Sequence, residues 1–70
     1  MDRKLYLELC QRNATHDKKT FVRYDGNDYL PTAYQLAFNA DGTVRHTAIL
    51  NEYKSNTLVY CKLKDVEEIT

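Results

Sequence analysis

The chain has 70 residues, which is enough for one domain and too few for two. Hydrophobic residues make up 43% of it and charged residues 29%, a mixture that excludes an intrinsically disordered protein and is typical of a small globular domain. Ten basic side chains balance ten acidic ones, which excludes a protein that coats nucleic acid through its net charge.

The charges are unevenly distributed along the chain. Up to Arg23 there are six basic and three acidic residues, whereas from Tyr24 onward there are four basic and seven acidic residues. The six early basic residues are Arg3, Lys4, Arg12, Lys18, Lys19 and Arg23. They could form a basic face of the folded domain or only the solvated side of a helix, and the second interpretation is favoured.

Cys10 and Cys61 lie far apart in the sequence and form no CxxC pair. Because no secretory segment precedes them, we expect two reduced, buried thiols, with a single disulfide as the alternative. No apolar run approaches the roughly 18 residues of a membrane-spanning helix. We therefore expect a cytoplasmic protein that has no membrane partner.

A helix is predicted over residues 3–13, beginning after Asp2, whose carboxylate can accept the free amide hydrogens of the first turn. Four side chains form an apolar stripe at the helical spacing, namely Leu5, Tyr6, Leu9 and Cys10. Leu7 lies off this stripe, so we expect it to be partly exposed. Asn13 is the expected end of the helix, because Asn tolerates the left-handed conformation.

Five short strands are predicted to follow, at residues 20–24, 32–39, 43–50, 57–62 and 66–69, with a helical turn at 63–65. Asp25-Gly26 indicates a tight hairpin turn, since Gly readily adopts a positive φ. Pro31 is expected to interrupt the chain before the second strand, because proline cannot donate to a sheet ladder. Ile49 makes the end of the third strand apolar on both faces, so that strand should be central or covered by the helix.

Three features occur in order from Thr20 to Ile69: a first strand followed by a long loop, a tightly turned central hairpin (YQLAFNADGTVRHTAIL) and a closing segment (LVYCKLKDVEEI). In this order the stretch resembles a small SH3-like barrel. The resemblance implies that the strands curl into a small barrel; with the helix predicted before them, we expect an α+β domain in which an N-terminal helix precedes four or five short antiparallel strands. It does not extend to proline-peptide binding, because the chain lacks Trp and a cluster of acids in the first long loop. The whole chain is also similar to small uncharacterised proteins found on mobile elements of Gram-positive bacteria.

No catalytic or metal-binding spacing is found, and no cofactor is expected. His16 and His46 belong to no HxxH or HExxH pattern, and a metal site would need three or four converging ligands. Cys10 and Cys61 occupy positions typical of small core residues, whereas a nucleophilic thiol must be exposed near a base. We therefore expect a protein that is not an enzyme.

Six tyrosines are the unusual feature of the composition. Tyr24, Tyr29 and Tyr53 fall at or near loops, where an aromatic side chain is harder to bury and can serve as a contact surface. With the nearby cations they form the candidate binding surface, which consists of Tyr24, Tyr29, Tyr53, Arg23, Lys18 and Lys19. Each tyrosine could instead fill a core that lacks Trp.

Two classes of function follow from these observations. The first is a non-enzymatic interaction module whose partner is another protein or a second copy of the chain. The alternative is a nucleic-acid accessory protein that uses the early basic residues for phosphates and the loop tyrosines for base stacking. The interaction module is favoured, because its partner can be bound without a net positive charge.

Overall fold

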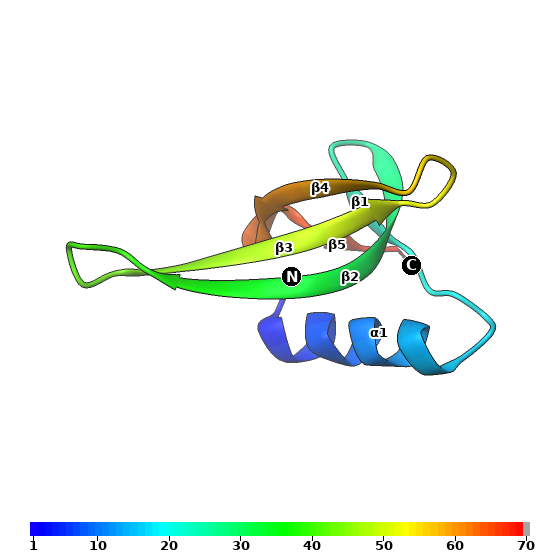
Figure 1. The fold of residues 1–70 in the computed structure, drawn as a ribbon, viewed down its shortest axis with the longest axis horizontal. Helices are drawn as coiled ribbons and strands as arrows, with labels where there is room; N and C mark the ends of the chain where they lie inside the picture. The colour runs from blue at the N-terminus through cyan, green and yellow to red at the C-terminus, as the bar shows by residue number, and fades with distance from the viewer. Residues whose placement is uncertain (70) are drawn as a thin grey trace.

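The computed structural model describes residues 1–69 and consists of one helix followed by five antiparallel strands (Figure 1). The elements are α1 (Arg3–Thr15), β1 (Val22–Tyr24), β2 (Asn27–Phe38), β3 (Val44–Glu52), β4 (Thr57–Lys62), the single 3₁₀ turn η1 (Leu63–Asp65) and β5 (Glu67–Glu68). The chain is therefore an α+β protein, as the sequence predicts.

Helix α1 begins where it was expected. Asp2 accepts a hydrogen bond from the backbone N–H of Leu5 at 3.2 Å, which satisfies one of the free donors of the first turn. Tyr6 and Leu9 are buried and Leu7 is exposed, which confirms the predicted stripe.

The predicted helix end at Asn13 is wrong, because α1 continues to Thr15. Asn13 is buried, and its side chain forms two hydrogen bonds with the backbone of Thr20: its Nδ2 donates to the carbonyl and its Oδ1 accepts from the N–H. This pairing also corrects the predicted strand at 20–24, since it occupies the backbone of Thr20. The strand β1 begins only at Val22.

The strands form one antiparallel sheet in the order β4-β3-β2-β1-β5. β3 lies between β2 and β4, which confirms the predicted central position of the third strand. Asp25 and Gly26 form the two-residue turn between β1 and β2, with φ of 51° and 79°.

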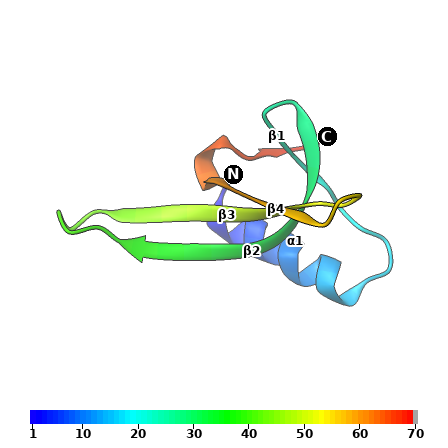
Figure 2. The same ribbon diagram turned by 45° about the horizontal axis from the view of Figure 1, so that its top comes forward.

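The interruption expected at Pro31 is wrong, because β2 runs unbroken from Asn27 to Phe38 and replaces the predicted strand at 32–39. Pro31 stands opposite Leu50, and the register shifts between Pro31 and Ala33, so the chain accommodates the missing donor with a bulge. Because a bulge bends a strand, β2 can pair with β1 at its start and with β3 along the rest of its length. Figure 2 shows this curvature.

The remaining strand bounds need smaller corrections. The strand predicted at 43–50 is β3, Val44–Glu52, which is extended because Glu52 pairs with Thr57. The strand predicted at 57–62 matches β4 and the helical turn matches η1. The last strand, predicted at 66–69, is reduced to Glu67–Glu68, since the N–H of Val66 closes the η1 turn by donating to the Leu63 carbonyl.

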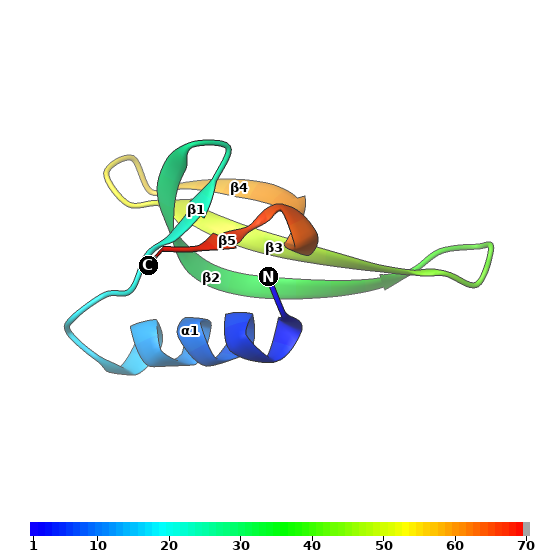
Figure 3. The same cartoon turned by 180° about the vertical axis from the view of Figure 1, so that it is seen from behind.

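The core lies between α1 and the inner face of the bent sheet, which β1, η1 and β5 help to enclose (Figure 3). Its residues are Tyr6, Leu9, Val22, Ala48, Leu50, Cys61, Leu63 and Val66. Tyr6 is fully buried, and its hydroxyl donates to the Ile49 carbonyl at 2.9 Å, which joins α1 to β3. Within residues 1–69 no ladder joins β4 to β5, so the sheet is bent but its hydrogen bonding does not close into a barrel.

Candidate binding cleft

The six residues of the predicted binding surface lie in different environments. Tyr24 and Tyr29 are brought together, with ring centroids 6.3 Å apart, and both pack against the core cluster. Tyr53 lies in the β3–β4 connection and is 59% exposed, and its ring meets Phe21 edge-on at 5.9 Å.

Two of the three cations of that surface have partners within the fold. The Arg23 guanidinium forms an ion pair with Asp28 at 3.2 Å. The Lys19 ammonium donates to the carbonyls of Asn13 and His16 at 2.7 and 3.1 Å, so it caps the end of α1. Lys18 is exposed in the same connection.

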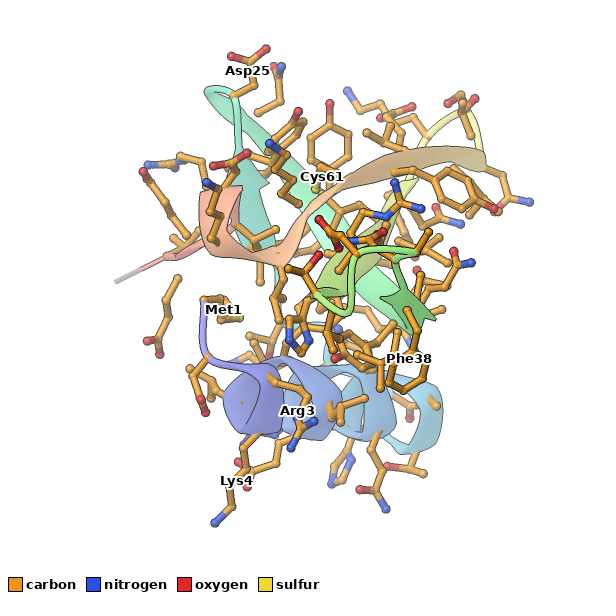
Figure 4. All side chains as sticks on the ribbon, turned by 90° about the vertical axis from the view of Figure 1, so that its left-hand side faces the viewer. Met1, Arg3, Lys4, Asp25, Phe38 and Cys61 are labelled. Atoms are coloured by element: carbon orange, nitrogen blue, oxygen red, sulfur yellow. The ribbon has the colours of Figure 1, made fainter. Side chains whose placement is uncertain are left out.

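A cleft of about 550 Å³ opens at the end of the molecule from which the β2–β3 hairpin projects. Three segments that are distant in sequence line it: the start of the chain (Met1, Arg3), the loop end of the β2–β3 hairpin (Asn39 and Val44–His46) and the β4–η1 junction (Lys62–Lys64). Figure 4 views the molecule from this end and shows Met1 and Arg3 beside the first turn of α1.

The cleft forms because β4 is shorter than its neighbour β3. The last residue of β4, Lys62, stands opposite Thr47, so β4 covers β3 only from Thr47 onward. Beyond that point the chain turns into η1, and the backbone nitrogen of Met1 donates to the Leu63 carbonyl at 3.0 Å. The start of the chain is thus fastened to η1, next to the uncovered edge of β3.

The lining of this cleft is cationic. Arg3, Arg45, Lys62 and Lys64 line it together with His46, and none of its lining residues carries a carboxylate. In the described chain, residues 1–69, the one ion pair is that between Arg23 and Asp28, so the four cleft cations have no carboxylate within ion-pairing distance. Unpaired charges of one sign in a concave site focus the electrostatic field and attract anions.

Asp65 directly follows Lys64 but does not line the cleft, and two further acidic residues near the cleft in sequence are bonded elsewhere. Asp2 caps α1. Asp41, in the hairpin loop, accepts hydrogen bonds from the hydroxyl and the N–H of Thr43 at 2.6 and 3.0 Å. These bonds lower the pKa of Asp41, because they stabilise its ionised form. Both carboxylates therefore serve local backbone geometry and do not neutralise the cleft.

His46 lines the cleft, and its ring packs against Tyr34. Its ring stacks on Tyr34 with centroids 5.9 Å apart, and the Tyr34 hydroxyl is hydrogen bonded to Nδ1 of His46. Tyr34 itself packs against the core cluster. The imidazole is therefore held in one orientation at the edge of the cleft.

Neither cysteine has the environment of a nucleophile. Cys61 is buried, Cys10 is half-buried, and both are free thiols. Burial raises the pKa of both thiols, which disfavours the reactive thiolate. Over residues 1–69 no three His, Cys, Asp or Glu side chains are grouped closely enough to hold a metal ion. In the same range, no helix has the length and apolar character needed to cross a membrane.

Sequence reasoning missed three of the four cleft cations. Arg3 belongs to the early basic residues, whereas Arg45, Lys62 and Lys64 come from the acidic part of the chain. The signal that could have found Lys62 and Lys64 is their position on either side of the apolar Leu63, at the predicted change from strand to helical turn. Burial of Leu63 directs both neighbours to the surface.

Comparison with known proteins gives no assignment: no family model, no curated protein and no solved structure matches the chain significantly. The cleft and its charges are therefore the basis for any statement of function.

Proposed function

We propose that this chain is a non-enzymatic, nucleic-acid-binding accessory module and that the cationic cleft is its binding site. The observation that carries the proposal is the convergence of Arg3, Arg45, Lys62 and Lys64 from three segments on one cleft that no carboxylate lines. Repeated phosphates are the anions that such a cluster suits best, because each phosphate contact releases bound counterions from the polymer.

The shape of the site agrees with a polymeric ligand better than with a small substrate. The cleft is open and lies on the outside of the fold, along the uncovered edge of β3. An enzyme of this size would need a pocket that surrounds its substrate, with a perturbed acid, base or nucleophile aimed into it. Neither thiol is among the residues that line the cleft.

The order of elements adds support by analogy. A helical turn between the last two strands is expected of an SH3-like domain, and domains of that architecture commonly serve as binding modules. Fold alone does not determine function, so the proposed activity depends on the cleft.

The test is a fluorescence-anisotropy titration with labelled single-stranded DNA, RNA and duplex DNA at 50 and 200 mM salt. If all four cations contact phosphates, the slope of log affinity against log salt for a single strand is about −3, and affinity falls about 50-fold between the two salt concentrations. Arg45→Gln and Lys62→Gln together should halve that slope. The matched control is Lys54→Gln, which lies outside the cleft. Absence of binding at 50 mM salt refutes the proposal.

A protein-binding or self-associating module is the second candidate, and a different surface favours it. Ile49 and Tyr60 stand opposite each other on the outer face of the sheet, and Leu58 lies on the same face opposite Asn51. Tyr60 is 61% exposed. Sedimentation velocity across a concentration series tests self-association, and a dimer that Tyr60→Ala dissociates would support this candidate.

A further inference from the structure

The β2–β3 hairpin carries an exposed apolar ribbon that continues the wall of the cleft. In the antiparallel register Phe38 stands opposite Val44, and Leu36 stands opposite His46, so these four residues share one face of the hairpin. Val44 and His46 also line the cleft. Side chains alternate along β3, so Arg45 lies on the other face, and the face that carries His46 runs outward as Leu36, Val44 and Phe38.

This ribbon extends beyond the cover that the domain provides. The hairpin projects past the first turn of α1 (Figure 1), and Figure 4 shows Phe38 on the side of the sheet where α1 and Arg3 lie. Phe38 is 78% exposed, Val44 42% and Leu36 41%. A phenyl ring that exposed contributes little to the core, so folding does not explain it.

The hairpin end that holds the ring is well defined. Asn39 and Thr43 close the loop through a backbone bond of 2.8 Å from the N–H of Asn39 to the carbonyl of Thr43, and through a side-chain bond of 2.8 Å. Gly42, with φ of 87°, adds a bond of 3.1 Å from its N–H to the Asn39 carbonyl. Because the loop directly follows Phe38, the backbone that carries the ring is fixed before any ligand arrives, which lowers the ordering cost of binding.

We infer that the cleft and the ribbon form one site for a single-stranded nucleic acid, with phosphates in the cleft and an unpaired base stacked on Phe38. This inference rests on the proposed function and specifies its ligand. A cationic groove next to an exposed aromatic ring is the arrangement that binds single strands with little sequence preference. A duplex suits it less, because duplex bases hide their faces within their own stack.

The experiment compares three fluorescent 12-mers at 50 mM salt: oligo(dT), a mixed-sequence duplex, and an abasic strand that keeps the phosphates but lacks the bases. The native chain is expected to bind oligo(dT) more tightly than either of the other two. Phe38→Ala should weaken oligo(dT) binding about 5- to 150-fold, the range typical of one stacked base, and leave the abasic strand unchanged. Since the Phe38 side chain is exposed, the thermal midpoint of the variant should stay close to that of the native chain.

Tyr60→Ala is the matched control, because it removes a similarly exposed ring from the opposite face of the sheet. It should bind all three strands like the native chain. If the chain binds none of the three, the proposed function itself fails. If it binds the abasic strand or the duplex as well as oligo(dT), and Phe38→Ala changes nothing, nucleic-acid binding stands but the stacking site is wrong. A dimer that Phe38→Ala dissociates would also overturn the inference, because a second copy would then cover the ribbon.

Discussion

Removing one hydroxyl from the core, in Tyr6→Phe, tests how α1 is attached to the sheet. The Tyr6 ring is fully buried, and its hydroxyl donates to the Ile49 carbonyl at 2.9 Å. Phenylalanine keeps the ring and its apolar contacts but leaves that carbonyl without this donor. Loss of one partner of a buried hydrogen bond costs about 1–3 kcal/mol.

That cost is large for a chain of this size. At about 0.05–0.15 kcal/mol per residue, a domain of this length has a free energy of unfolding of about 4–10 kcal/mol. A loss of about 1–3 kcal/mol therefore removes a substantial fraction of the stability. For small domains it corresponds to a fall of about 5–20 °C in the thermal midpoint.

The assay is urea and thermal unfolding followed by circular dichroism, with Tyr60→Phe as the control because Tyr60 is exposed. The control should change the free energy of unfolding by less than about 0.5 kcal/mol. Two results would contradict this prediction: a Tyr6→Phe variant as stable as the native chain, or a Tyr60→Phe variant that loses as much stability as Tyr6→Phe. Either result would mean that the bond to Ile49 does not hold the helix on the sheet.

Three further predictions concern stability. Asn13→Ala should lower the free energy of unfolding by about 2–3 kcal/mol in urea titrations, because both hydrogen bonds to the Thr20 backbone are lost; Asn13→Asp, which keeps the acceptor, should cost less. Gly26→Ala should cost about 1–2 kcal/mol in the same assay, since φ is 79° there, and Gly26→Asn should cost less because Asn tolerates that conformation. Burial raises the pKa of Tyr6, so the unfolded chain loses this phenol proton first and stability should fall as pH rises above about 10. The contribution is at most about 1.4 kcal/mol per pH unit, and urea midpoints measured between pH 9 and 11 should fall less in Tyr6→Phe than in the native chain, since the buried thiols, whose pKa is also raised, still contribute there.

The parts of the fold that local chemistry determines could be predicted from the sequence. Asp2 caps its own helix, and Asp25-Gly26 makes its own turn without reference to the rest of the chain. Each of these depends on residues a few positions apart, and each was predicted correctly.

The errors occurred where distant residues decide the outcome. Asn is a residue type that often ends a helix. The Asn13 side chain instead forms hydrogen bonds with the backbone of Thr20, and α1 continues to Thr15. Proline is a residue type that often interrupts a strand, but the bulge between Pro31 and Ala33 lets β2 continue. In both cases the local preference is real, and a tertiary contact overrides it.

The cleft could not be predicted for a stronger reason. Arg3, Arg45 and Lys62 become neighbours only because β4 ends opposite Thr47 and the start of the chain is bonded to Leu63. The length of one strand relative to its neighbour is set by the whole sheet. The spacing of residues in the sequence does not indicate this relative length, so a search for sequence motifs does not find the cleft residues.

The neutral net charge did not indicate the cleft either, because a net charge does not say where the charges of each sign lie on the surface. Four of the carboxylates are bonded to nearby groups of the fold: Asp2 to a helix end, Asp28 to Arg23, and Asp41 and Glu52 to the turns beside them. Hydrogen bonds lower the pKa of both Asp41 and Glu52, so these charges are stabilised within their own turns. The cleft cations have no such partners among the described residues. A chain with no net charge can therefore present a concentrated positive field at one end, and that local field determines which ligand it attracts.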